Sequence, residues 1–214
     1  MSVPPGDSAP TPDHFEDLYV ATADPWHLTE RAYDLRKYAL TVDSLSAPRY
    51  ASAFEPACSV GVLTRMLATK CDELLACDLS HVAVEQARAH CSGMPHVRVE
   101  RRFLPEEWPA GRAPGFDLIV LSEFLYYLDD IRFAAVLDRT VDSLAPGGTL
   151  AAVHWRPAAP GHVRPAESVH AALRALPGLV RMVEHREPDF LLDVFVAGDG
   201  PAEALSPAAR EGLR

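Results

Sequence analysis

One short stretch of the chain combines an acidic residue, a tight turn and a helix start, and these are the features that bind a nucleotide-like ligand. Glu55 ends an apolar segment that can form a buried strand, and Ser59 can cap the helix after the turn. About 20 residues further on, a second apolar segment ends in Asp78, where a strand–helix–strand unit places a carboxylate on ribose hydroxyls. The spacing therefore predicts a site for a ligand that contains a nucleoside.

The glycine content of the turn narrows the class of ligand. A pyrophosphate needs the glycines of G-x-G-x-x-G so that backbone amides can reach it, whereas this turn has only Gly61. Gly61 either allows close packing or is an ordinary turn glycine. Glu55 is costly to bury unless it is hydrogen-bonded, so we expect it to bind turn amides or an amino group of the ligand. Asp78 has the alternative role of helix cap, although Ser80 can cap equally well.

The elements that must position these residues are strands alternating with helices, a pattern that predicts a parallel sheet. Two helices between residues 14 and 45 precede the first strand, and they either form a lid over the ligand or simply pack on the sheet. The short link Glu187-Pro188-Asp189 predicts that the last two strands form an antiparallel hairpin. The expected strands are 50–55, 73–78, 96–101, 116–121, 149–155, 179–185 and 190–197, and the expected helices are 59–69, 81–92, one from 130 to about the glycines at 147–148, and 167–176.

Length and composition predict a single folded domain. We expect a domain over residues 13–197, with a disordered tail at 1–12 and a frayed tail at 198–214, because both ends are rich in proline and small residues. The net charge of -10 argues against nucleic acid and anionic membranes as partners, and favours a neutral or cationic small molecule. The longest apolar stretch, 116–128, contains Asp117 and Glu123, so no membrane span is expected.

The four cysteines indicate a reduced, cytoplasmic protein. None of them forms a C-x-x-C pair, and neither they nor the histidines have metal-ligand spacing, so no metal site is expected. We expect a monomer or a homodimer.

Several motifs resemble those of class I S-adenosylmethionine (SAM) methyltransferases. Residues 55–61, Glu-Pro-Ala-Cys-Ser-Val-Gly, resemble their first motif and Asp78 the acidic second, while 116–120 resemble the fourth strand and 144–148 the turn before the fifth. More narrowly, the chain resembles the nodulation protein S type, which N-methylates amino sugars of chitooligosaccharides. The segments that carry this likeness are 24–26, 36–40, 121–123, 126–128, 153–155 and 187–194.

The resemblance implies an α/β Rossmann-like sheet of seven strands in the order 3-2-1-4-5-7-6, with the last strand antiparallel and a helical lid at 13–46. It implies SAM as methyl donor, S-adenosylhomocysteine as product and an amine nitrogen of a small metabolite as acceptor. Transfer to a hydroxyl or carboxylate oxygen is one alternative. A SAM-binding module without catalytic activity is another, because Ala57 replaces a glycine that the family turn usually carries.

The resemblance also suggests site residues. Arg36 is a candidate for the carboxylate of SAM, although a solvated arginine explains it equally well. Phe103 stands where many relatives have an acidic residue, so adenine is expected against the side chains and backbone of Phe103 and Leu104. The expected cofactor-binding residues are Arg36, Glu55, Ala57, Cys58, Gly61, Asp78, Leu79, Phe103, Leu104 and Ser122.

Methyl transfer from a sulfonium requires aligned and desolvated reactants, and an amine acceptor must first be unprotonated. Glu123 and His154 follow or end predicted strands on the ligand-binding rim, so each is a candidate base, and a structural role remains equally open for both. Tyr126, and its neighbour Tyr127, can line the acceptor site. The expected catalytic residues are thus His154, Glu123 and Tyr126.

Overall fold

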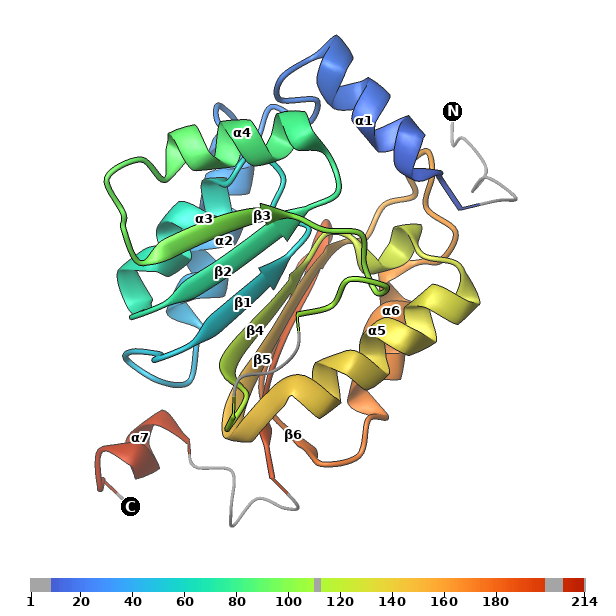
Figure 1. Cartoon of the computed structure of the whole chain (residues 1–214). Coiled ribbons are helices and arrows are strands. Elements are labelled where there is room, and N and C mark those ends of the chain that lie inside the picture. The colour runs from blue at the N-terminus through green and yellow to red at the C-terminus, as the bar shows by residue number, and fades with distance from the viewer. Residues whose placement is uncertain (1–8, 110–112, 199–205, 214) are drawn as a thin grey trace.

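The computed structural model describes residues 9–109, 113–198 and 206–213, and its centre is a seven-stranded sheet (Figure 1). The strand order is β3-β2-β1-β4-β5-β7-β6, which confirms the predicted class and order. Strands β1 to β5 run parallel, and β7 runs antiparallel to both β5 and β6. The strands are β1 (Ala53–Pro56), β2 (Leu74–Asp78), β3 (Val97–Arg101), β4 (Phe116–Ser122), β5 (Leu144–Trp155), β6 (Leu179–Arg186) and β7 (Phe190–Ala197).

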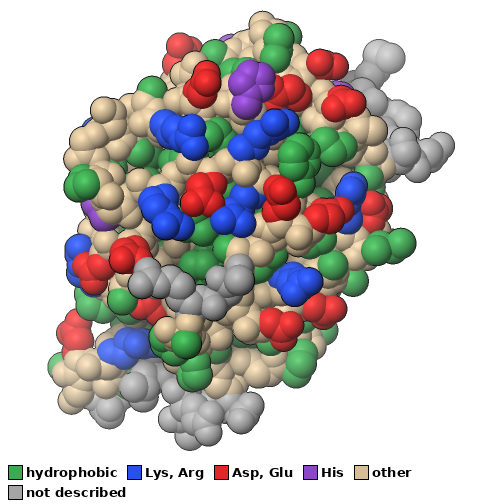
Figure 2. Space-filling model, in the orientation of Figure 1, with side chains coloured by type: hydrophobic (Ala, Val, Ile, Leu, Met, Phe, Trp, Pro, Cys, Tyr) green, Lys and Arg blue, Asp and Glu red, His purple; other side chains and the backbone are tan. Residues whose placement is uncertain are grey.

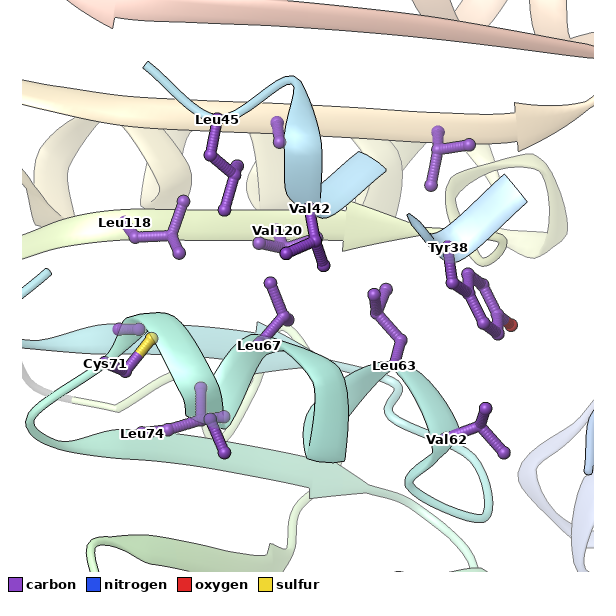
Figure 3. Packing of buried hydrophobic residues seen from close by; sticks show 14 of the residues in the cluster. Tyr38, Val42, Leu45, Val62, Leu63, Leu67, Cys71, Leu74, Leu118 and Val120 are labelled. Carbon is purple, nitrogen blue, oxygen red and sulfur yellow. The ribbon is translucent and has the colours of Figure 1, made fainter. Parts of the chain in front are cut away.

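Helices cover both faces of the sheet, because the central strands are apolar on both sides. On β4, Leu118 and Val120 contact the cluster that contains α2 and α3, whereas Ile119 and Leu121 contact the cluster of α5 and α6. Figure 3 shows the first of these clusters, with Leu67 of α3 facing the β4 side chains. The helices are α1 (Pro12–Ala21), α2 (Ala32–Asp43), α3 (Val62–Leu67), α4 (His81–His90), α5 (Asp130–Ser143), α6 (Ala166–Arg174) and α7 (Pro207–Arg210), with 3-10 turns η1 (Ala68–Lys70) and η2 (Leu125–Tyr127).

Several predicted boundaries differ from the structure, and two of them differ for clear local reasons. The helix expected from residue 59 begins at Val62, because residues 57–61 form the turn and Gly61, with φ of 82°, is the N-cap. The strand expected from residue 149 begins at Leu144, since the Pro146-Gly147-Gly148 segment continues β5 past an irregularity in its pairing with β4. The predicted tails fall partly on residues 1–8, 199–205 and 214, which lie outside the described residues.

The surface over β3 and α4 mixes both signs of charge (Figure 2). Glu100 pairs with Arg98 and Arg102 along β3. Within the described ranges no helix has the length and apolarity needed to cross a bilayer.

Candidate active site

A cavity of about 410 Å³ lies at the carboxyl ends of the parallel strands, where open α/β sheets bind ligands. Its walls come from α1, α2, the turn after β1, the ends of β2 and β4, η2 and the loop after β5. Figure 1 shows α1 (dark blue) beyond the carboxyl ends of β1 and β2, so this helix closes the site from outside the sheet.

The turn after β1 has three left-handed residues within five positions. Ala57, Ser59 and Gly61 have φ of 55°, 51° and 82°. A Cβ on Gly61 would lie 2.8 Å from the Cα of Ala87, so glycine is required there for α3 to approach α4. Ala57 adopts the same backbone region with its methyl group present, which costs about 1–2 kcal/mol.

Asp78 is fixed by that turn and faces the cavity. Its Oδ2 accepts from the Ser59 amide at 2.9 Å and its Oδ1 from the Ser80 amide at 3.0 Å. The Ser80 hydroxyl, rather than Asp78, caps α4 by accepting from the Ala83 amide. Burial raises the pKa of Asp78 to about 6. Each carboxylate oxygen keeps a lone pair that a ligand hydroxyl can use.

At the same end of the cavity as Asp78, the Glu55 carboxyl group has fewer hydrogen-bond partners than Asp78 has. It is 1% exposed, it lines the cavity, and its Oε2 has no hydrogen-bond partner among the described residues. Burial, and to a smaller extent the charge of Asp78, raises the pKa of Glu55 to about 8. A buried, unpaired carboxyl oxygen of this kind fits a cationic ligand group, which would both pair with it and favour its ionised form.

Glu123, directly after β4, is held by three donors. Its Oε1 accepts from Lys37 Nζ at 2.6 Å, and its Oε2 accepts from the Tyr126 hydroxyl at 2.5 Å and the Trp155 amide at 2.8 Å. Lys37 also donates to Asp34 at 3.0 Å. Burial opposes the charge of Lys37, but the two carboxylates raise its pKa above the ordinary value. Glu123 therefore fixes the positions of Lys37, Tyr126 and the Trp155 backbone through charge-assisted hydrogen bonds.

His154 lies behind the cavity wall and outside the described cavity lining, so the structure does not support its predicted contact with the acceptor. Consecutive strand residues face opposite sides, so Trp155 lines the cavity while His154 faces α6 and is fully buried. Its Nδ1 lies 3.2 Å from His170 Nε2, and His170 Nδ1 lies 2.7 Å from Asp193 Oδ2. Burial lowers the pKa of His154 well below its ordinary value. This buried chain links β5, α6 and β7.

Arg36 does not reach the cavity. Its side chain is exposed and forms two hydrogen bonds to Glu187, at 2.9 and 2.8 Å, so this geometry supports the alternative of a solvated arginine rather than a contact with a cofactor carboxylate. Arg31, the N-cap residue of α2, lines the cavity instead. Within the described part of the chain, no ion pair is found for Arg31.

Phe103 lies in a neighbouring depression rather than in the main cavity. That depression has a volume of about 310 Å³ and shares Phe15, Leu79, Leu104, Tyr127 and Leu128 with the main cavity. The Phe103 amide already donates to Glu107 Oε2 at 2.7 Å, whereas the Phe103 residue lines the depression together with Leu79 and Leu104.

The structure thus brings most of the predicted site residues together and separates four. Arg36, Gly61, Phe103 and His154 are absent from the described cavity lining. The predicted residues that line the cavity are Glu55, Ala57, Cys58, Asp78, Leu79, Leu104, Ser122, Glu123 and Tyr126.

Sequence reasoning missed side chains that reach the cavity from α1, α2 and the loop after β5. Tyr19 donates from its hydroxyl to the Ser59 hydroxyl at 2.7 Å and so ties α1 to the turn. Lys37 and His162 lie at the other end of the cavity. The Asp24-Pro25-Trp26 segment was a usable signal, because Trp26 both lines the cavity and packs edge-on against Tyr19. Lys37 lies within the segment 36–40 that carries the family likeness, whereas no local pattern marks His162.

A family profile and curated relatives identify the same protein family for this chain. The profile described as Nodulation protein S (NodS) matches residues 12–187. Nodulation protein S of Rhizobium tropici is 33% identical over 178 residues, which cover 78% of this chain and 72% of that protein. The Bradyrhizobium diazoefficiens protein is also 33% identical, over 138 residues that span 61% of this chain and 62% of that relative, less than two thirds of its length.

Solved structures agree with the sequence matches. The N-methyltransferase NodS from Bradyrhizobium japonicum WM9, in complex with S-adenosylhomocysteine, superposes with a TM-score of 0.74 at 27% identity, covering 88% of this chain and 99% of that one. These matches confirm the predicted resemblance and the class I methyltransferase fold.

Proposed function

Because the chain belongs to the nodulation protein S family, we propose that it transfers the methyl group of SAM to an amine nitrogen of a small molecule, with an amino sugar as the expected acceptor. The observation that carries the proposal is a single cavity with two chemically different ends. Glu55 and Asp78 form one end, and Glu123, Tyr126 and aromatic rings form the other.

The first end suits SAM, which supplies an electrophilic methyl group on sulfur. The unpaired Glu55 oxygen suits the ammonium group, and Asp78 suits the ribose hydroxyls. Leu79 and Leu104 provide apolar surface for the adenine. Arg31 replaces Arg36 as the proposed partner of the carboxylate, since guanidinium matches a carboxylate bidentately.

The second end suits a neutral or cationic acceptor. Tyr33 and Trp155 meet edge to face, with ring centroids 5.5 Å apart, and both line the cavity. Aromatic faces and the charge of Glu123 favour a cation over an anion. These rings also exclude water from the reacting groups, which strengthens electrostatic interactions inside the site. Sugar rings commonly present apolar faces and hydroxyls that such a surface can accept.

The proposal also covers the helical lid, the domain bounds, the cellular setting and the oligomeric state. We propose that α1 and α2, within residues 13–46, act as the lid of a domain spanning 13–197. Tyr19 supports this role through its contact with the turn. The four cysteines are free and buried, which supports a reduced, cytoplasmic setting. A monomer or homodimer remains our expectation.

The test is incubation with isotopically labelled SAM and a chitooligosaccharide carrying one free amine, followed by location of the methyl group by mass spectrometry and NMR. The fully N-acetylated oligosaccharide is the matched control, because its nitrogen is not nucleophilic. We expect methylation of the free amine only. A methyl group on oxygen would favour the O-methyltransferase alternative. SAM binding without transfer to any amine or hydroxyl would favour a non-catalytic SAM-binding module.

A further inference from the structure

His162 occupies a defined position at the acceptor end of the cavity. It lies in the loop between β5 and α6, is 6% exposed as a residue, and lines the cavity. Its ring stacks on that of Tyr126, with centroids 3.8 Å apart and an interplanar angle of 24°, and meets the edge of Tyr127 at 5.1 Å. The ring is thus held beside the tyrosine that donates to Glu123.

The backbone around His162 is fixed, whereas its ring nitrogens are available. The His162 amide donates to the Ala159 carbonyl at 3.2 Å, and the Val163 amide donates to the Tyr126 carbonyl at 2.9 Å, which fastens the loop to η2. In the described part of the chain, no hydrogen-bond partner is found for the imidazole nitrogens of His162. The ring is therefore rigidly placed and able to bind a ligand proton.

The charge state of His162 suits a base. Burial lowers the pKa of His162, and the carboxylate of Glu123 from β4 opposes this shift only in part. The other groups around it are the tyrosine hydroxyls of η2 and, on β5, His154, which is neutral for the same reason. The imidazole is consequently uncharged at neutral pH, with a nitrogen lone pair available.

The carboxylates near the acceptor end are already paired with a cation. Both Glu123 and Asp34 accept from Lys37, and Glu123 also accepts from the Tyr126 hydroxyl and the Trp155 amide. Glu55 and Asp78 belong to the opposite end of the cavity. A group that must take a proton from an amine needs a free lone pair within reach, and His162 meets this condition among the described residues that line the acceptor end.

We propose that His162 is a catalytic residue that accepts the proton which the acceptor ammonium loses before methyl transfer; this rests on the proposed N-methyltransferase function. The N–H bond breaks, its proton goes to an imidazole nitrogen, and the amine keeps the electron pair. That pair then forms the N–C bond while the C–S bond breaks and its electrons stay on sulfur, giving a thioether and a protonated methylamine. The imidazolium returns its proton to water at the cavity mouth.

The experiment compares turnover of the wild type and His162→Gln with the mono-deacetylated oligosaccharide across pH 6 to 10. At pH 7 we expect kcat to fall about 100-fold or more, as is typical when a general base is lost. SAM affinity should stay within about twofold, because the cofactor end is untouched. The deficit should shrink as pH rises, since the amine then loses its proton without assistance. A purely structural role would instead lower kcat by the same factor at every pH.

Two further measurements make the outcome decisive. His90→Gln on α4, away from the cavity, is the matched control and should keep wild-type turnover. NMR of ¹⁵N-histidine in the folded wild type should show a His162 ring that stays neutral at pH 7, and a charged ring would overturn the assignment even if a variant fails to fold. Full turnover of His162→Gln beside an active wild type would overturn this inference alone. A wild type inactive on every amine would overturn the proposed function and this inference with it.

Discussion

The two ends of the cavity are built in different ways. The two carboxyl groups of the cofactor end, Glu55 and Asp78, come from one continuous strand–turn–helix–strand segment, in which the Ser59 and Ser80 amides hold Asp78. The acceptor end is assembled by side chains from α2, β4, η2 and the loop after β5, with Glu123 bonded to Lys37 across 86 positions of sequence. The comparison shows that local backbone geometry fixes one half of the site and long-range ion pairing fixes the other. Mutations at the two ends should therefore have separable effects.

The largest effect is expected from Lys37→Met at the acceptor end. The substitution leaves Glu123 and the buried Asp34 without their shared cation, and an unpaired buried charge destabilises by about 3–5 kcal/mol. The free energy of unfolding, measured by urea denaturation at pH 7, should fall by that amount. Arg36→Met on the same helix breaks an exposed pair with Glu187 and should have a much smaller effect. Equal losses in the two variants would show that the Lys37 pairing does not stabilise this end.

The next largest effects are a loss of SAM affinity from a substitution at the cofactor end and a loss of turnover from one at the acceptor end. Asp78→Ala removes charge-assisted hydrogen bonds worth about 1.5–3 kcal/mol and should weaken SAM binding about 10- to 100-fold. Glu123→Gln should leave the SAM dissociation constant within a few fold while lowering kcat, because its partners are Lys37, Tyr126 and the Trp155 amide. Calorimetry and steady-state kinetics measure the two quantities. An unchanged dissociation constant for Asp78→Ala would refute its ribose-binding role.

A smaller, pH-dependent effect is expected from Glu55. Its pKa rises from 4.5 to about 8 on burial, so the folded protein binds a proton more tightly than the unfolded chain does. The stabilising contribution of the protonated form is complete below about pH 4.5 and is lost as pH rises towards 8. Glu55→Gln should therefore stabilise the ligand-free protein more at pH 8.5 than at pH 5, as urea denaturation at both pH values can measure. A gain independent of pH would contradict the shifted carboxyl group.

The smallest effect is expected at Ala57. Its φ of 55° costs about 1–2 kcal/mol for a residue with a Cβ, whereas glycine adds about 0.4–1 kcal/mol of unfolded-state entropy. Ala57→Gly should therefore raise the unfolding free energy by up to about 1 kcal/mol and leave SAM affinity no weaker. Ala53→Gly within β1 is the control and should destabilise. Destabilisation by Ala57→Gly would show that its methyl contacts outweigh the backbone strain.

The same contrast explains what could be predicted from sequence. The fold, the turn and Asp78 follow from strand–helix alternation and from a fixed spacing within one segment. Arg36 and His154 lie outside the described cavity lining, because a helix or strand position alone does not tell which face meets the cavity. Arg31 and Trp155 face it instead. Lys37 and His162 were missed because their roles depend on partners that only the folded chain brings close.

The central claim is that this cavity binds SAM with the ammonium group paired to Glu55. The most direct test is calorimetric titration of the wild type with SAM at pH 7, repeated in two buffers of different ionisation enthalpy. We predict one SAM bound per chain with release of close to one proton, and loss of that proton release in Glu55→Gln. SAM binding without proton release would contradict the pairing with Glu55, and the absence of detectable binding would contradict the assigned activity altogether.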